Sequence, residues 1–421
     1  MGEIRGARPR LLLLFPSQSY RVDAFVKAAE RTGVELWLGT DLPAAFTKLG
    51  PPVVGVDLRA PAAAAAAIAR LAAEAPFAGI LGTNETSAVV AAMAASLLGL
   101  PCASPEGALA ARDKRRMREL LARAGVPSPR HRVLAPGVAA RDLAGGLGFP
   151  CVVKPPMLTG SQGVIRADDA EALAAAVARV RRILARHGGD ARAEPGFFDV
   201  LVEDYLPGRE VAVEAIMTDG ELSPLAIFDK PDELAGPFFE ETLYVTPSRL
   251  PAAAQADILD VAARAARALG LTHGPIHVEL RTEGGRSAVV ELAARSIGGL
   301  CSRVFTLVAG PLEDVLLAHA AGLPLPRDAR RAGAAGVMMM PIPRSGVLRG
   351  VEGLDEARRV PGVDGVTVAI EPGEAIRALP EGASYLGFIF ASGAAPAAVE
   401  ASLREAHAAL RFTWAPLLDL L

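Results

Sequence analysis

The chain has 421 residues, of which 51% are hydrophobic and 22% are charged, close to the average of globular proteins. This length favours two to four domains over a single hydrophobic core. The 44 Lys and Arg residues against 47 Asp and Glu residues give a formal net charge of −3, which argues against a dedicated nucleic-acid binder.

The N-terminal sequence and the cysteine pattern both bear on the cell compartment. Arginines precede the apolar run Leu11–Phe15, but its five residues are fewer than the ~7–15 of a signal-peptide core. We expect a buried parallel strand there instead. No other apolar stretch reaches the ~18 residues of a membrane span. Cys102, Cys151 and Cys301 are widely spaced and indicate no disulfide framework or CxxC site. We expect a soluble, cytoplasmic protein that binds neither nucleic acid nor membrane.

Residues 1–105 alternate short apolar runs with segments of helical spacing, a pattern typical of a doubly wound parallel sheet. The expected strands are Leu11–Phe15, Glu35–Leu38, Val53–Val56 and Ile80–Leu81, and the expected helices are Val22–Thr32, Ala60–Ala75 and Thr86–Leu98. No GxGxxG motif follows the first strand, so a dinucleotide site is not supported. Glu85 lies at the strand edge where open α/β sheets bind ligands, while Thr83 or Asn84 could equally be a helix cap.

The middle of the chain begins with a helix and continues mostly as strands. Ser104, Pro105 and Glu106 are typical of a helix start, and we expect this helix to carry Lys114 and to end near Gly125. Further expected elements are the helices Ala170–Arg186 and Ala252–Leu269, an exposed loop at 187–190, and the strands 275–281 and 287–292 joined by a turn at 283–285. From about residue 333 we expect a separate α/β segment with strands Val337–Met340, Val366–Ile370 and Leu386–Phe390 and the helix Pro396–Arg411.

Two patterns near the middle of the chain could bind a phosphorylated ligand. A strand ends in Lys154, and a glycine-containing turn follows at 159–163. Such a turn lets backbone N–H groups approach a polyphosphate, although a plain β-hairpin explains the pattern as well. Downstream, Glu203 ends an apolar strand and Glu210 follows seven residues later. This spacing would suit a cofactor held between two strands, and solvated surface acids would look the same.

Two further acids lie inside apolar strands that a short turn joins. Alternation along the first strand puts His277 and Glu279 on one face, and Glu291 lies in the second strand. A buried carboxylate is costly unless it is paired or bound to metal. Two such oxygen ligands suit Mg²⁺ together with substrate phosphates. The alternative is an ion pair between one acid and Arg295, with the other acid at a solvated edge.

The order of these elements resembles the ATP-grasp superfamily over residues 1 to about 320. The residues that carry the resemblance are Lys114, Lys154 with its Gly-Ser-x-Gly loop, Glu203 with Leu206 and Glu210, and Glu279 with Glu291 and Arg295. Within the superfamily, Asp229-Lys230, the stretch 236–241, the stretch 291–299 and the C-terminal segment are similar to the L-amino-acid ligases.

The resemblance implies a multidomain fold of the α/β and α+β classes. A Rossmann-like pre-ATP-grasp domain with a doubly wound parallel sheet would occupy residues 1–105. The ATP-grasp domain, two α+β subdomains that clamp ATP, would occupy 106–325, with its small lid subdomain at about 127–207. A C-terminal α+β extension would occupy 333–421.

The resemblance also implies a role for each matching residue. ATP would be held by Lys114, Lys154, Gly160, Ser161, Gly163, Glu203, Asp204, Leu206 and Glu210. Mg²⁺, or Mn²⁺ in its place, would be held by Glu279 and Glu291, and Arg295 would steady the reacting acyl group. The candidate substrate-binding residues are Glu85, Glu241, His277 and Gly298, of which we favour Glu241 for a substrate ammonium group. The superfamily usually has Asn where this chain has Ala293, so one metal ion or two are both compatible with the sequence.

The implied activity is an ATP-dependent, ADP-forming ligation of a carboxylate to an amine through an acyl phosphate. An amino acid and a second amino acid or amine would be the substrates, and a homodimer is compatible with the sequence. Because an acyl phosphate hydrolyses in water, a closing lid is expected. The alternatives are a purine-pathway or biotin-carboxylase-like ligase, or an ATP-binding subunit that has lost catalysis.

Overall fold

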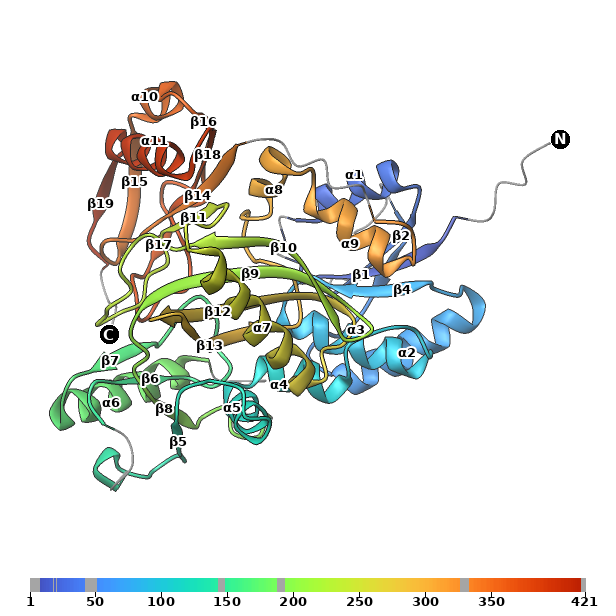
Figure 1. The fold of residues 1–421 in the computed structure, drawn as a ribbon, viewed down its shortest axis with the longest axis horizontal. Helices are drawn as coiled ribbons and strands as arrows, with labels where there is room; N and C mark the ends of the chain where they lie inside the picture. Colours follow the sequence, from blue (N-terminus) through green and yellow to red (C-terminus); the bar gives the residue numbers. More distant parts are fainter. Residues whose placement is uncertain are drawn as a thin grey trace.

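The computed structural model describes residues 8–17, 19, 21–41, 51–142, 148–187, 194–325 and 333–417. Four parts follow one another along the chain. They are an N-terminal unit (residues 8–97), the unit expected to be the lid and called here the lid (131–204), a central region (209–320) and a C-terminal segment (333–417), which Figure 1 shows around the central strands. The loop expected at 187–190 falls largely on residues 188–190, which lie outside the described residues.

The N-terminal unit is a four-stranded parallel sheet in the order β3-β2-β1-β4. Its elements are β1 (Arg10–Leu14), α1 (Val22–Thr32), β2 (Glu35–Thr40), β3 (Val53–Gly55), α2 (Pro61–Glu74), β4 (Gly79–Gly82) and α3 (Glu85–Leu97). Leu11 and Leu13 of the inner strand β1 pack toward α1, while Leu12 and Leu14 pack toward α2 and α3. Burial on both faces explains why this run is apolar without alternation, so the prediction of a buried parallel strand is confirmed.

The chain leaves this unit through two helices where the sequence predicted one. Ser104 caps α4 (Pro105–Arg112), since its Oγ accepts a hydrogen bond from the Gly107 N–H at 2.9 Å. Asp113 has an extended backbone, ends α4 and caps α5 (Lys114–Arg123) by accepting the Arg115 N–H at 3.0 Å. The prediction of a single helix is wrong because the buried Asp113 carboxylate satisfies the free N–H groups of a second helix start.

The lid is a four-stranded antiparallel sheet in the order β5-β8-β6-β7, against which α6 packs. Its elements are β5 (His131–Leu134), β6 (Cys151–Lys154), β7 (Ile165–Ala167), α6 (Ala170–Arg186) and β8 (Val200–Asp204), with a short 3-10 helix at Ala140–Asp142. Helix α6 has the bounds that its apolar spacing predicted, and Asp169 caps it by accepting the Ala172 N–H at 2.8 Å. In Figure 1 the lid lies at the lower left, below the central strands.

The central region forms most of an eight-stranded sheet, in the order β13-β12-β9-β10-β11-β14-β18-β16. Its own elements are β9 (Arg209–Thr218), β10 (Glu221–Asp229), β11 (Leu243–Thr246), α7 (Ala252–Leu269), β12 (Gly274–Glu283), β13 (Arg286–Ala293), α8 (Arg303–Val308) and α9 (Leu312–Ala320). One face of β9 packs on α7 through Val211, Val213 and Ala215. Alternation along β9 puts Glu210 and Glu214 on the face opposite α7, where both side chains are buried.

The C-terminal segment continues this sheet, which corrects the expectation of a separate unit. Its elements are β14 (Ala334–Met340), β15 (Gly346–Glu352), α10 (Leu354–Arg359), β16 (Val363–Val368), β17 (Ala375–Ile376), β18 (Gly387–Gly393), α11 (Pro396–Ala409) and β19 (Arg411–Ala415). Strands β11 and β14 are both fully buried, and they pair antiparallel from Leu243↔Met338 to Thr246↔Ala335. Buried backbone groups require such partners, and local sequence patterns do not reveal which strand supplies them.

Two further observations concern the expected absence of a disulfide framework and of a membrane span. Cys102, Cys151 and Cys301 are free thiols. Among the residues that the structure describes, no helix has both the length and the apolar character needed to cross a bilayer.

Candidate active site

A cavity of about 620 Å³ is lined by residues from all four parts of the chain. Nearly all of the predicted site residues line it, namely Glu85, Lys114, Lys154, Gly160, Ser161, Glu203, Asp204, Leu206, Glu210, Glu241, His277, Glu279, Glu291, Arg295 and Gly298. Gly163 is the exception among them. The motifs that lie far apart in the sequence therefore meet at one place in the fold.

On the lid side of the cavity, Glu203 is 2% exposed and pairs with two cations. Its Oε1 accepts a hydrogen bond from Arg118 Nε at 2.6 Å, and its Oε2 lies 2.5 Å from Lys154 Nζ. Burial by itself would raise the pKa of Glu203, but the positive charges of Arg118 and Lys154 have the larger effect. The pKa therefore lies below its usual value, and the carboxylate stays ionised. Burial lowers the pKa of Lys154 more than Glu203 raises it. An adenine amino group at Glu203 would therefore share a carboxylate whose oxygens already have partners.

Lys114 connects the lid loop to the central sheet. Its Nζ donates to the Leu158 carbonyl at 2.8 Å and lies 3.0 Å from Glu291 Oε1. The Asp113 cap starts α5 at this residue, and the lysine side chain is 5% exposed. Lys114 thus neutralises one of the two predicted metal ligands, and it lines the cavity.

The glycine-containing turn of the lid rests on the C-terminal segment. Its left-handed residues are Gly160 (φ 62°), Ser161 (φ 55°) and Gly163 (φ 75°). The Gly163 N–H donates to the Pro380 carbonyl at 2.9 Å, and Arg179 of α6 pairs with Glu381 at 2.8 Å. Gly163 packs against Pro155, because a Cβ on it would lie 2.8 Å from the proline ring. It therefore supports the turn from behind and does not line the cavity.

Lys230 contacts three carboxylates that line the cavity. Its Nζ is 2.8 Å from Glu210 Oε1, 3.5 Å from Glu279 Oε2, and in contact with Glu241 Oε1. The three acids each bring one oxygen within 4.8 Å of the others, a spacing that could hold a metal ion. Burial lowers the pKa of Lys230, but the three carboxylates raise it well above its usual value. The ammonium group therefore offsets one of the three negative charges of this acid cluster.

The predicted metal pair, Glu279 and Glu291, lies on neighbouring strands directly opposite each other. Burial raises the pKa of Glu279, but Lys230 and then His277 lower it well below the usual range. His277 Nε2 lies 3.5 Å from Glu279 Oε1, so the predicted shared face is confirmed. Burial lowers the pKa of His277, while Glu214 and Glu279 raise it to about 9, so the imidazole is charged at neutral pH.

Arg295 pairs with Glu85, and not with Glu279 or Glu291 as the alternative interpretation had it. Arg295 Nε donates to Glu85 Oε1 at 2.8 Å. Burial by itself would raise the pKa of Glu85, but the positive charge of Arg295 has the larger effect, so the pKa lies below its usual value. The expected helix cap is present as well, because Asn84 Oδ1 accepts the Ser87 N–H at 2.8 Å. Since the charge of Glu85 is matched by Arg295, Glu85 is a weaker candidate for binding a substrate ammonium group.

Two comparisons by sequence agree with this geometry. Residues 147–304 match the ATP-grasp domain family, and residues 338–415 match the family of L-amino acid ligase C-terminal domain 2. The alanine–anticapsin ligase of Bacillus subtilis is 32% identical over 232 residues, which are 52% of this chain and about half, 48%, of that relative's length. A D-alanine–D-alanine ligase of Desulforudis audaxviator is 31% identical over 278 residues, which are 63% of this chain and 84% of that enzyme. The chain belongs to the ATP-grasp ligases.

A solved structure shows how far the similarity extends. The L-amino acid ligase of Bacillus licheniformis superposes with a TM-score of 0.81 at 26% identity, and the alignment covers 97% of this chain and 100% of that one. The resemblance read from the sequence, to ATP-grasp proteins and within them to the L-amino-acid ligases, is thereby confirmed.

In this ATP-grasp ligase, several cavity residues had not been singled out from the sequence. Arg118 follows Lys114 by four residues, a spacing that puts both on one face of a helix. Arg281 follows Glu279 by two residues, so strand alternation puts it on the same face. Arg281 Nε donates to Glu210 Oε2 at 2.9 Å and fixes that acid in place. Both arginines were visible by spacing, but each also looked like an ordinary surface cation.

The buried pairing of Arg118 predicts a large stability effect. Arg118→Met should lower the free energy of unfolding by about 3 to 5 kcal/mol, because it leaves a buried carboxylate with one cation fewer. The arginine is 0% exposed and also donates to the Val290 carbonyl at 2.5 Å. Urea unfolding monitored by circular dichroism measures the change.

The matched control lies on the same helix. Arg116 is 54% exposed in its side chain and lies 3.6 Å from Asp113, so Arg116→Met should cost less than about 1 kcal/mol. Equal urea midpoints for the two variants would contradict the structural importance of the pair between Arg118 and Glu203.

Proposed function

We propose that the protein is an ADP-forming carboxylate–amine ligase that joins an amino acid to a second amino acid or amine through an acyl phosphate. The observation that carries this proposal is that two buried ammonium groups, on Lys114 and Lys154, line one cavity together with the carboxylates of Glu279 and Glu291. The named relatives, an alanine–anticapsin ligase and a D-alanine–D-alanine ligase, support an amino acid as substrate.

The reaction needs ATP because a carboxylate is a poor acyl donor. Transfer of the γ-phosphoryl group to a carboxylate oxygen releases ADP and forms an acyl phosphate. The amine nitrogen then attacks the carbonyl carbon, a C–N bond forms, phosphate leaves, and the nitrogen loses one proton. Catalysis of such steps is mostly positioning and neutralisation of charge. In this chain, Lys114 and Lys154 would contact the phosphates and Arg295 the anionic acyl group.

The nucleotide would lie between the lid and the central sheet. Gly160 and Ser161 of the cover loop would lie over its phosphates, and the backbone around Asp204 and Leu206 would hold the base. Glu210, fixed by Arg281, would bind the ribose hydroxyls. We also propose that residues about 127–207 move as the lid of the ATP-grasp domain 106–325, between the N-terminal domain 1–105 and the extension 333–421.

The residues present fit a magnesium ion. Glu279 and Glu291 are cross-strand partners that both line the cavity, and oxygen ligands of this kind suit Mg²⁺ or Mn²⁺. Such an ion would neutralise charge on the phosphoryl oxygens. Lys114 and Lys230 hold the two carboxylates in place. Ala293 offers no side-chain oxygen, so the protein ligands seen here favour one fully held ion.

The charges around Lys230 favour a cationic group of the substrate. Four carboxylates meet three cations there, namely Glu210, Glu214, Glu241 and Glu279 with Lys230, His277 and Arg281. Burial and the neighbouring Glu279 raise the pKa of Glu241 to about 7, although Lys230 lowers it. When Glu241 is ionised, the four carboxylates exceed the three cations by one negative charge. A substrate ammonium at Glu241 would neutralise it, and the free face of the cavity there would hold the rest of the amino acid.

The cavity wall near Glu241 is apolar and comes from the C-terminal segment. Met339 and Phe388 are buried, and the rings of Tyr385 and Phe388 are 6.2 Å apart between centroids. Gly299 has a left-handed backbone (φ 61°) and lies beside this wall, since a Cβ built on it would be 3.4 Å from the Phe388 ring, an ordinary van der Waals contact. This lining supports an amino acid with an apolar side chain as one substrate.

The function is tested by phosphate release from ATP and Mg²⁺ with a panel of amino-acid pairs. We expect release, with a condensed product detected by mass spectrometry, only when both substrates are present. Release of AMP without an acceptor would contradict the proposal. Bicarbonate-dependent ADP formation would favour a carboxylase-like ligase, and nucleotide binding without turnover on any pair would favour a subunit that has lost catalysis.

The metal assignment predicts a large loss of turnover. Glu279→Gln and Glu291→Gln should each lower kcat at least about 100-fold, because stabilisation of the transferring phosphoryl group is weakened. Glu283→Gln is the matched control at the exposed end of the same hairpin and should leave kcat unchanged. Steady-state kinetics at saturating ATP and Mg²⁺ measures the change, and wild-type turnover in both site variants would remove the assignment.

The anchor assignment predicts a selective loss of substrate binding. Glu241→Gln should raise the KM for the amino acid about 10-fold or more while leaving the KM for ATP nearly unchanged, since a charged contact to one substrate is lost. Glu240→Gln is the control, because Glu240 accepts the Ile342 N–H at 3.0 Å and a glutamine can still accept it. An unchanged amino-acid KM in Glu241→Gln, with a raised one in Glu85→Gln, would transfer the role to Glu85.

A further inference from the structure

The segment 295–299, called here the Arg295 loop, follows strand β13 directly and lines the cavity. It belongs to no helix or strand, so no ladder of backbone hydrogen bonds fixes its position. Its residues Ser296 and Ile297 are 4% and 2% exposed. Buried peptide groups require partners, and those of Ile297 find them on two charged side chains from distant parts of the chain.

The first partner comes from the N-terminal unit. Arg21 precedes helix α1, and its Nη1 donates to the Ile297 carbonyl at 3.0 Å and to Ser296 Oγ at 3.1 Å. Its Nη2 donates to Glu313 of α9 at 3.1 Å. Arg21 is 5% exposed and Glu313 is 4% exposed, so this is a buried and internally neutral pair.

The second partner comes from the central sheet. Glu214 of β9 is 0% exposed, and both of its carboxylate oxygens accept the Ile297 N–H, at 2.9 and 3.0 Å. Glu214 Oε2 also lies 3.0 Å from His277 Nδ1. The carbonyl and the N–H of one residue are thus held from opposite sides by Arg21 and Glu214.

We propose that Arg21 and Glu214 are positioning residues, which hold Ile297 and thereby set the place of Arg295 for the ligase reaction. The inference rests on the proposed function for its effect on rate. Only Ser296 lies between Ile297 and Arg295, whose Nη1 donates back to the Ser296 carbonyl at 2.8 Å. The loop and its arginine therefore move together.

Energetics support positioning over stability as the role of these groups. Buried ion pairs contribute little net stability compared with apolar residues of the same volume. A displacement of about 1 Å at a reacting group can cost about 100-fold in rate. Arg21 and Glu214 together form a clamp on Ile297. This clamp also makes the N-terminal unit part of the site, because Arg21 reaches the loop from outside the residues 147–304 that match the ATP-grasp domain family.

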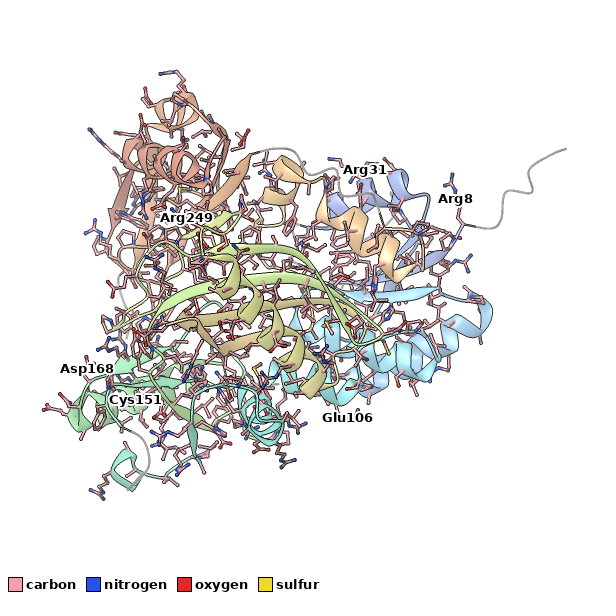
Figure 2. The ribbon with its side chains drawn as sticks, viewed as in Figure 1. Arg8, Arg31, Glu106, Cys151, Asp168 and Arg249 are labelled. Atoms are coloured by element: carbon pink, nitrogen blue, oxygen red, sulfur yellow. The ribbon has the colours of Figure 1, made fainter. Side chains whose placement is uncertain are left out.

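The chain offers a matched pair of variants for a test. Arg31 of α1 pairs with Asp314 of α9, with Nε 2.9 Å from Oδ2, so it joins the same two helices as Arg21 and Glu313. Arg31, labelled at the upper right of Figure 2, is 45% exposed in its side chain and pairs with Asp314, whereas Arg21 also binds the Arg295 loop. Arg21→Met and Arg31→Met each remove one ion pair between these helices, and only the first removes the hold on Ile297.

The first measurement is hydrogen–deuterium exchange of the full-length protein, which needs no substrate. Peptides covering 295–299 should exchange at least about 10-fold faster in Arg21→Met than in the wild type or in Arg31→Met. The second is steady-state kinetics, in which Arg21→Met should lower kcat about 10- to 100-fold with the KM for ATP within about 2-fold. Arg31→Met should change neither quantity.

Several results would overturn the proposal. Unchanged exchange in 295–299, or an equal loss of kcat in both methionine variants, would show that Arg21 only joins two helices. A raised amino-acid KM with unchanged kcat would make Arg21 a substrate-binding residue instead. If Arg21→Met does not fold, Arg21→Lys keeps the charge and should show a smaller change of the same kind, and wild-type behaviour of that variant would contradict the clamp. An inactive wild type would refute the proposed function and leave the exchange result to decide on the clamp.

Discussion

The buried carboxylates of the cavity depend on a cation placed against each of them. An ionised acid inside a protein is strongly unfavourable unless it is paired, and here the partners come from different parts of the chain. Helix α5 supplies Lys114 to Glu291, strand β6 supplies Lys154 to Glu203, and Lys230, the residue after strand β10, pairs with Glu279. These ion pairs, which stabilise the buried acids, therefore also fix the lid, helix α5 and the central sheet relative to one another around the cavity. Two of these cations, Lys114 and Lys154, also line the cavity.

Two contacts close this space from opposite ends. The lid turn rests on the C-terminal segment through Gly163 and Pro380, and the pair of Arg179 with Glu381 reinforces that contact. The N-terminal unit approaches from the other side through Arg21 and Glu85. A reactive acyl phosphate needs an enclosure of this kind, since water would hydrolyse it. The C-terminal segment, which matches the family of L-amino acid ligase C-terminal domain 2, contributes a wall of the site as well as three strands of the large sheet.

Local periodicity predicted much of the fold, because burial on one face fixes spacing. Helices α6 and α7 and the hairpin of β12 and β13 have the expected ranges to within a residue or two. The break at Asp113 was missed because an acid within a helical pattern is usually exposed, whereas here it is buried. The pairing of β11 with β14 was missed because an apolar strand does not encode which edge it joins.

The sequence predicted site residues where a charged side chain interrupts an apolar strand. It did not predict pairs whose two residues lie far apart along the chain. Glu279 and Glu291 stood out as acids within apolar strands, and both line the cavity. Arg21 did not stand out, because its partners at Ser296 and Ile297 follow 275 and 276 residues later. The pairing of Glu85 with Arg295 was hidden for the same reason.

The central claim is that this cavity makes an acyl phosphate, and isotope transfer tests it most directly. An amino-acid donor labelled with ¹⁸O in its carboxylate is incubated with the protein, ATP, Mg²⁺ and an acceptor amine. Our account predicts that one ¹⁸O per turnover appears in the released phosphate, because the oxygen that attacks the γ-phosphoryl group leaves with it. Product formation with unlabelled phosphate would contradict the account.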